Sequence, residues 1–109
     1  MKYFCSVNER VGTCYHEFYR GKWDGKTFWK SDSILLHDDT LTELKIYEAF
    51  AAAIPDYAPY GVTEVNKAQW DAVLEYPSLS PEAKAALAEA EPWVKETFKS
   101  ERVFTILGI

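Results

Sequence analysis

Alternating apolar and polar side chains mark the beginning of the chain as β-structure. Residues 2–7 and residues 13–20 both alternate with a period of two, which is the pattern of a strand that buries one face. Residues 8–12 supply turn residues between them, and Asp24-Gly25 is a pair favoured in tight hairpins because it tolerates positive φ. The pattern therefore predicts a three-stranded antiparallel meander over residues 2–31.

The middle of the chain predicts three helices, each of which begins with a capping side chain. Thr40-Leu41-Thr42-Glu43 is a capping box, and an apolar stripe at helical spacing follows it as far as Pro55. Asn66-Lys67-Ala68-Gln69 is a second capping box. Ser80-Pro81-Glu82 combines the preferred cap with a proline at the first helical position, and we expect Pro92 to kink or restart this third helix.

Three short apolar runs predict further strands. Residues 34–36 can form a fourth strand, and residues 60–65 are short and β-branched enough for another. Residues 103–109 are nearly all apolar, as expected of a strand buried on both faces in the middle of a sheet. We therefore expect an α+β fold, in which an antiparallel N-terminal meander is extended by the C-terminal strand and three to four helices pack on the sheet.

Composition bounds the organisation and the location of the protein. The length of 109 residues predicts a single domain over residues 1–109. Hydrophobic residues make up 48% of the chain, as in globular proteins, but the aromatic share of 16% predicts that some rings reach the surface. No apolar run is long enough to span a membrane, and residues 1–6 lack the apolar core of a secretory signal. We expect a cytoplasmic protein that has no membrane partner.

The charge of the chain is polarised between its two parts. The net charge of −5 argues against nucleic-acid binding, which depends on clustered Lys and Arg. Residues 1–30 carry six basic and three acidic side chains, a balance of +3, whereas residues 31–109 carry six basic and fourteen acidic ones, a balance of −8. The acidic helical part can steer a basic partner towards it. The alternative is that these carboxylates only solvate helix surfaces.

Candidate catalytic and metal-binding residues are few. Cys14 and His16 share one face of a predicted strand, and Cys5 can join them across the hairpin, but a structural zinc site wants four ligands in closer spacings. We interpret these residues as buried thiols and a hydrogen-bonded imidazole. His37-Asp38-Asp39 resembles an acid–base cluster, yet carboxylates are also favoured at a helix N-terminus by its dipole. No phosphate-binding or hydrolase motif is present, so we expect no metal and no cofactor.

The segment from Pro55 to Gly61 has the composition of a binding loop. Its two tyrosines, two prolines and one acid combine rigidity with amphipathic contact area. With Trp23, Trp29 and Tyr76-Pro77 it can form an aromatic and acidic docking face. The alternative is that Tyr57 and Tyr60 pin the loop onto the sheet.

Residues 61–70, Gly-Val-Thr-Glu-Val-Asn-Lys-Ala-Gln-Trp, form a short strand, a cap and a helix that carries Trp at its fourth position. This order of elements resembles small bacterial immunity proteins of polymorphic toxin and contact-dependent inhibition systems. The resemblance implies an acidic cytosolic protein that binds and neutralises a co-produced toxin.

We therefore expect a protein-binding domain that blocks a basic partner, such as a toxin domain, by steric and electrostatic means. The residues we expect to bind the partner are Asp38, Asp39, Asp56, Tyr57, Tyr60 and Glu64. The alternative is a small enzyme in which His16 with Cys14, or His37 with Asp38, acts as an acid–base pair in a pocket between sheet and helices.

Overall fold

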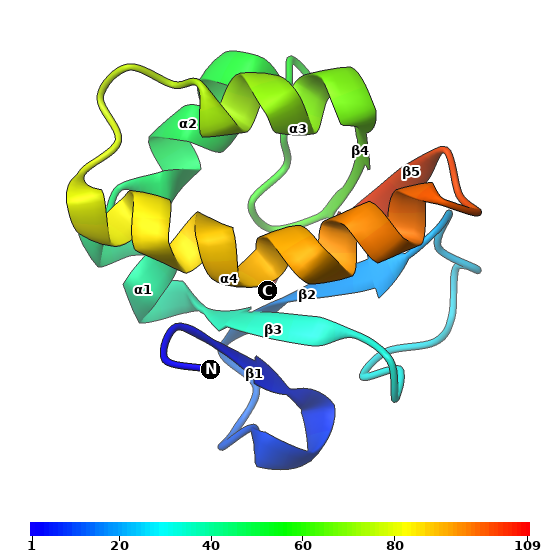
Figure 1. Ribbon diagram of the computed structural model, residues 1–109. Coiled ribbons are helices and arrows are strands. Elements are labelled where there is room, and N and C mark those ends of the chain that lie inside the picture. The colour runs from blue at the N-terminus through cyan, green and yellow to red at the C-terminus, as the bar shows by residue number, and fades with distance from the viewer.

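The computed structural model describes all residues from 1 to 109 and has one antiparallel sheet with helices packed on it (Figure 1). The predicted α+β class is confirmed. In chain order the elements are β1 (Phe4–Ser6), the 3-10 helix η1 (Val7–Glu9), β2 (Tyr15–Arg20), β3 (Ile34–His37), α1 (Asp38–Glu43), α2 (Ile46–Ala53), β4 (Val62–Asn66), α3 (Lys67–Leu74), α4 (Pro81–Phe98) and β5 (Val103–Leu107).

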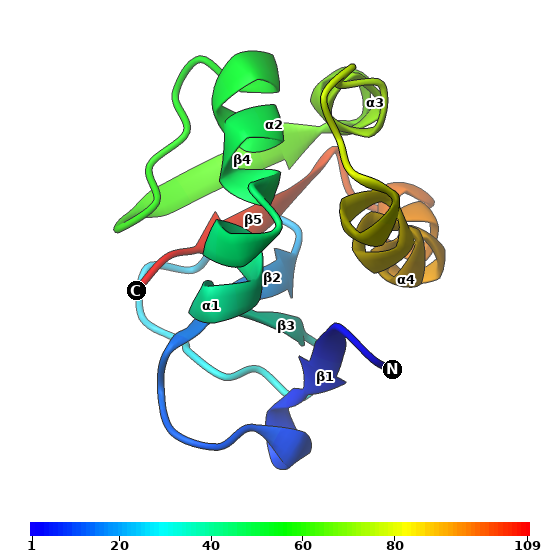
Figure 2. The ribbon, with the colours of Figure 1, turned by 90° about the vertical axis from the view of Figure 1, so that its left-hand side faces the viewer.

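The strand order is β1-β3-β2-β5-β4, with every neighbouring pair antiparallel, and Figure 2 shows the strands in this sequence from one edge to the other. The predicted meander over residues 2–31 is therefore wrong, because β1 pairs with β3 and not with β2. The expected C-terminal strand is confirmed, since β5 lies inside the sheet between β2 and β4. Its Phe104 and Thr105 are both fully buried.

The predicted hairpin at Asp24-Gly25 is instead a local turn within an irregular connection, residues 21–33. The Asp24 carboxylate accepts hydrogen bonds from the side chain and N–H of Thr27 and from the N–H of Lys26. These hydrogen bonds lower the pKa of Asp24 to about 2. Because the carboxylate accepts from the N–H groups of Lys26 and Thr27, these two groups are not available for a strand ladder.

A buried glutamate fixes the other end of the β2–β3 connection. Glu17 points to the sheet face opposite Phe18 and is only 2% exposed. Its carboxylate accepts hydrogen bonds from the N–H of Trp29 at 2.7 Å, the N–H of Lys30 at 3.0 Å and the hydroxyl of Ser33 at 2.6 Å. Three donors offset the loss of hydration, so this carboxylate can stay buried and hold the connection in place.

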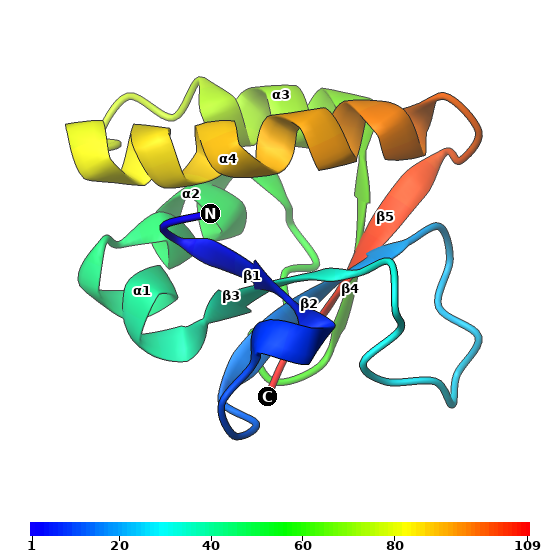
Figure 3. The ribbon, with the colours of Figure 1, turned by 60° about the horizontal axis from the view of Figure 1, so that its bottom comes forward.

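The core lies between the sheet and the helices. Its centre is Phe18, whose ring lies within 6.4 Å of five other rings, those of Phe4, Phe50, Trp70, Trp93 and Phe104. Figure 3 shows α3 and α4 together on one side of the sheet, with the β2–β3 connection projecting away from them. None of the helices combines the length and the apolar character that crossing a membrane requires.

The first predicted helix begins earlier and is divided in two. His37 is the N-cap of α1, because its Nδ1 accepts a hydrogen bond from the N–H of Asp39 at 3.0 Å. The predicted cap at Thr40 is therefore wrong, since Thr40 already lies inside this helix. Lys45 has left-handed backbone geometry with a φ of 56°, which ends the first helical segment and lets α2 begin at Ile46 in a new direction.

The other two helix starts are confirmed. Asn66 and Gln69 form the predicted capping box, with bonds of 2.8 and 2.9 Å between each side chain and the other's N–H. Ser80 accepts a hydrogen bond from the N–H of Ala83 at 3.0 Å. Pro92 does not end or restart α4, which continues to Phe98. Its exposed ring points away from the buried face, so the helix loses one hydrogen bond there and keeps its packing.

Candidate functional site

The molecule has one pocket, of about 220 Å³, between α1, the start of α2 and the loop that precedes β4. The residues that line it are Asp38, Leu41, Thr42, Tyr47, Pro59 and Tyr60. We call these six residues the pocket face. It combines one carboxylate with two tyrosine rings, and it contains no Lys or Arg.

Asp38 is the charged group of the pocket face. It is the first residue of α1, and its backbone N–H donates to the carbonyl of Cys14 at 2.9 Å. The antiparallel register places His16 opposite Leu36, and Asp38 follows two residues after Leu36, so His16 and Asp38 are diagonal neighbours on the same face of β2 and the end of β3. The Nε2 of His16 lies 2.8 Å from the Oδ1 of Asp38, which orients the carboxylate.

The imidazole itself is closed off from solvent. His16 is 2% exposed, its Nδ1 is buried without a hydrogen-bond partner, and it does not line the pocket. Only Asp38, whose side chain is 35% exposed, faces the pocket from this pair. The pair therefore supplies an oriented carboxylate, while its imidazole stays behind the pocket wall.

The two tyrosines of the predicted binding loop have different roles. Tyr57 packs its ring 5.5 Å from that of Phe50, and its hydroxyl is buried without a hydrogen-bond partner. Burial, and to a lesser extent the nearby Asp38 and Tyr60, raise the pKa of Tyr57 to about 12. Tyr60, by contrast, is 81% exposed. Tyr57 thus pins the loop against Phe50 of α2 and not onto the sheet as predicted, whereas the Tyr60 ring is free to contact another molecule.

The remaining predicted binding residues lie outside the pocket lining. Asp39 is exposed in the first turn of α1, and this position agrees with the dipole interpretation. Its carboxylate lies 3.7 Å from the Nδ1 of His37. Asp56 is exposed in the turn after α2. Glu64 on β4 lies opposite Thr105 on β5. Its side chain points to the sheet face opposite that of its neighbour Val65, which is in the core.

The predicted cluster of Cys5, Cys14 and His16 does not form. The strand β3 separates β1 from β2, so the two cysteines are not on neighbouring strands, and both are free thiols. Cys14 is exposed before β2 and Cys5 is only partly buried, so the interpretation of both as buried thiols is wrong. His16 is buried against Asp38. Burial and the charge of Glu9 raise the pKa of Cys5, which reduces its thiolate fraction. No group of three or more His, Cys, Asp or Glu side chains is placed to hold a metal ion.

The wider aromatic docking face is not continuous with the pocket. Trp23 packs on Phe28 with 5.2 Å between ring centroids, and Trp29 lies under the guanidinium of Arg10 at 4.4 Å. Both tryptophans belong to the β2–β3 connection. Tyr76 packs against the core from the connection between α3 and α4. These rings serve the packing of two separate connections.

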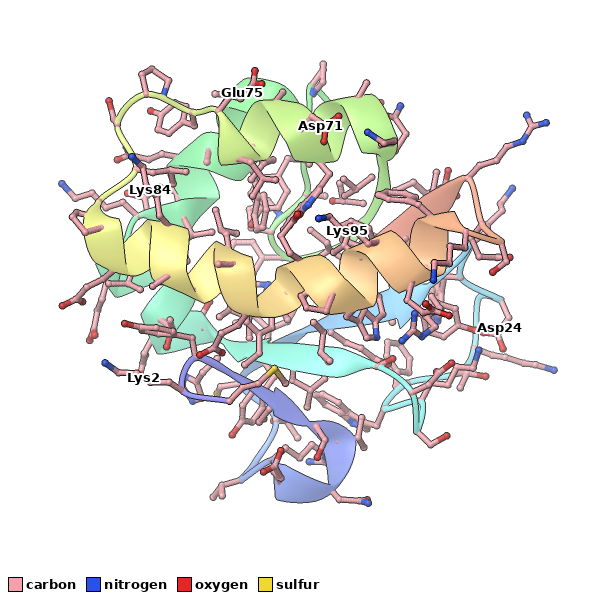
Figure 4. All side chains as sticks on the ribbon, viewed as in Figure 1. Lys2, Asp24, Asp71, Glu75, Lys84 and Lys95 are labelled. Atoms are coloured by element: carbon pink, nitrogen blue, oxygen red, sulfur yellow. The ribbon has the colours of Figure 1, made fainter.

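Three of the acidic side chains are neutralised locally on the helices. Figure 4 labels Asp71 on α3, Glu75 directly after that helix, and Lys84 and Lys95 on α4, so this surface carries both signs of charge. The helices also hold three ion pairs between side chains three or four residues apart: Lys67–Asp71 at 3.0 Å, Glu91–Lys95 at 3.6 Å and Glu96–Lys99 at 3.0 Å. The solvation interpretation therefore fits the paired carboxylates of α3 and α4, whereas Asp38 in the pocket pairs only with His16.

Sequence reasoning missed Leu41, Thr42 and Tyr47 as site residues. Tyr47 had the spacing of the buried stripe of one long helix, but the left-handed Lys45 turns α2 and leaves this ring 38% exposed. Likewise the partnership of His16 with Asp38 depends on a strand register that no local motif specifies.

The fold and the site together define an α+β domain with a small acidic and aromatic pocket at one end of its helical layer. Comparisons with protein-family models, curated proteins and solved structures found no match to the chain.

Proposed function

We propose that this chain is a protein-binding domain that docks a basic segment of a partner protein on the pocket face. The observation that carries the proposal is the pairing of an oriented carboxylate, Asp38, with the exposed ring of Tyr60 in one concave site. Tyrosine contributes large contact area at low conformational entropy, and binding hot spots are rich in it. The carboxylate adds attraction for basic partners and repels acidic ones.

The specific form of the proposal is an immunity protein that neutralises a cognate toxin in the cytoplasm by covering a basic site. The charge balance of −8 over residues 31–109 supports this form, because an acidic surface accelerates encounter with a basic partner. A cytoplasmic setting also suits the two free thiols, Cys5 and Cys14. In this role Asp39 and Asp56 are exposed charges around the pocket face that steer association.

Affinity capture from the native cell tests the proposal. The tagged chain should retain a stoichiometric protein partner, whereas Tyr60→Ala should lose at least tenfold in affinity for it. The matched control is Phe28→Ala, which removes an aromatic ring that is 56% exposed on the β2–β3 connection and should leave capture unchanged. If capture is unaffected by Tyr60→Ala, or equally weakened by Phe28→Ala, the pocket face is not the docking site.

An acid–base enzyme is the second candidate, because a histidine and a carboxylate lie 2.8 Å apart beside the pocket. In this scheme Asp38 would exchange a proton with a substrate in the pocket, and His16 would orient it. The screen is hydrolysis or isomerisation of small substrates by the wild-type chain and by His16→Asn. An activity that this variant loses while remaining folded would favour the enzyme over the binding domain.

A further inference from the structure

The volume and the charge of the pocket suit a single basic side chain. Its volume of about 220 Å³ is below the roughly 300–1,000 Å³ of typical small-molecule sites. Its lining offers one carboxylate and no positive group, so a cation is the complementary guest. A single basic side chain of a partner satisfies both conditions.

Asp38 is free to accept such a cation. Its Oδ1 is bonded to the Nε2 of His16, and no group of the chain donates to its Oδ2. By contrast Asp71 and Glu91 already pair with lysines on their own helices. The carboxylate of the pocket is therefore oriented by His16 and has no Lys or Arg partner.

The tyrosines favour a guanidinium over an ammonium. Tyr60 is 81% exposed and Tyr47 is 38% exposed, so both rings have accessible surface beside Asp38. A cation over a tyrosine face is attracted by the ring quadrupole, and the planar guanidinium can stack there while it donates to a carboxylate. Leu41 and Pro59 provide apolar surface for the methylene stem.

We infer that the pocket face binds an arginine side chain, with Asp38 accepting its N–H groups and the rings of Tyr47 and Tyr60 flanking it. This inference rests on the proposed function, because it names the group of the partner that enters the site. His16 is a positioning residue here: it holds Asp38 and does not touch the guest.

The experiment uses the full chain labelled with ¹⁵N and follows its amide signals by NMR during titration. The probes are N-acetylarginine methylamide, the corresponding lysine derivative and the corresponding citrulline derivative, which is the uncharged analogue of arginine. We expect arginine to shift the signals of Leu41, Thr42, Tyr47 and Tyr60 with millimolar affinity, with lysine weaker and citrulline at least tenfold weaker. Equal affinities for arginine and citrulline would overturn the inference.

Variants link the binding to the named residues. Asp38→Asn keeps an oxygen that can accept from His16 but removes the charge, and it should weaken arginine binding at least tenfold. The matched control Asp71→Asn also removes one carboxylate and should bind as the wild type does. Tyr60→Ala, which alters an exposed ring outside the core, should weaken binding severalfold even if Asp38→Asn fails to fold. Wild-type affinity in either Asp38→Asn or Tyr60→Ala would contradict the assignment.

The two proposals can fail separately. If arginine does not bind but partner capture still depends on Tyr60, the docking proposal stands and the arginine inference is wrong. If arginine binds and Asp38→Asn abolishes it, but the native cell yields no partner, the pocket assignment stands and the proposed function is wrong.

Discussion

Tyr57 places its hydroxyl in the interior near the carboxylate of Asp38, and no group of the chain hydrogen-bonds to it. Both features disfavour the tyrosinate, so the pKa of Tyr57 rises from 10.0 to about 12. An unfolded chain ionises this tyrosine near pH 10, whereas the folded chain keeps its proton, so the free energy of unfolding should fall as the pH rises from 10.0 to about 12. The pKa of Tyr57 therefore depends both on its burial and on the charge of Asp38.

We predict that Asp38→Asn lowers the pKa of Tyr57 while leaving it above 10.0, because the charge is removed and burial remains. The measurement is the ultraviolet absorbance of tyrosinate as a function of pH, with Tyr57→Phe identifying the late transition. Asp71→Asn is the control, since it removes a carboxylate on α3 that is not among the charges that raise the pKa of Tyr57. A Tyr57 titration that is identical with and without Asp38→Asn would show that the charge has no influence on the hydroxyl.

Glu89 ties the N-terminal segment to α4. Burial alone would raise the pKa of Glu89, but hydrogen bonds from the N–H groups of Phe4, Tyr3 and Lys2, at 2.8 to 2.9 Å, together outweigh it and lower the pKa. Because the pKa of Glu89 is lower in the folded chain than its unfolded value near 4.5, the carboxylate stabilises the fold at pH values above 4.5. This contribution is lost as the pH falls through the pKa of the folded chain.

We predict that Glu89→Gln lowers the free energy of unfolding by about 1–3 kcal/mol near neutral pH, because charge-assisted hydrogen bonds are lost. Urea unfolding at several pH values measures it, and the difference from wild type should shrink below about pH 4, as carboxylates protonate. Glu96→Gln on the same helix, whose carboxylate forms only an exposed ion pair with Lys99, should change stability by less than about 0.5 kcal/mol. Equal effects of the two substitutions would contradict this role of Glu89.

At the scale of elements, short-range signals were the reliable ones. The capping box of Asn66 and Gln69 and the Ser80-Pro81 helix start were predicted correctly, because each is decided by groups within four residues of one another. The division after α1 could not be predicted, since it depends on the left-handed geometry of Lys45, a residue type that rarely adopts it. The pairing of β1 with β3 joins residues about thirty positions apart, such as Phe4 and Leu36, and no local pattern specifies it.

The candidate site could be predicted only in part for the same reason. The sequence indicated Asp38 and Tyr60, which line the pocket, and Tyr57, which packs against Phe50 in the core. It also pointed to Glu64, which the strand alternation turns to another face. The sequence predicted a hydrogen-bonded imidazole at His16 but not its partner Asp38, because spacing along one strand does not specify which residue of the neighbouring strand lies beside it.

The left-handed residue between α1 and α2 gives a prediction about stability. Lys45 has a φ of 56°, where a Cβ atom is disfavoured and glycine is not. We predict that Lys45→Gly raises the free energy of unfolding by about 0.5–1 kcal/mol, the strain relieved being partly offset by the greater entropy of the unfolded chain. Thermal unfolding measures it, with Lys45→Ala as the control that keeps a Cβ atom. A glycine variant no more stable than the alanine variant would argue against strain at this position.

The β2–β3 connection depends on one buried carboxylate. We predict that Glu17→Ala destabilises the fold by about 3 kcal/mol or more, because the donors of Trp29, Lys30 and Ser33 lose their acceptor together. Urea unfolding gives the size of the loss, and hydrogen exchange of the Trp29 and Lys30 amides shows whether the connection detaches. Glu64→Ala, on the same sheet face but exposed, is the control and should have little effect. Unchanged amide protection in Glu17→Ala would exclude this anchoring role.

At the scale of the whole molecule, the order of strands in space differs most from their order in the chain at β5. The last strand of the sequence pairs with both β2 and β4. Without β5, therefore, β4 has no hydrogen-bonded connection to the other three strands. It also buries Phe104, Ile106 and Leu107, each worth about 1.5–3 kcal/mol of burial free energy. Their sum is comparable to the total stability of a typical domain, about 5–15 kcal/mol.

We therefore predict that a chain ending at Arg102 has no cooperative unfolding transition, because β4 loses its only strand partner and β2 becomes an open edge. Urea titrations followed by circular dichroism and by tryptophan fluorescence measure this. The control is a chain that lacks only the exposed Ile109, which should unfold with nearly the wild-type midpoint because Gly108, whose N–H donates to the carbonyl of Gly61 at 2.8 Å, is retained. A cooperative transition in the chain ending at Arg102 would mean that the helices and the first three strands are stable by themselves, and that the pocket face does not require the complete sheet.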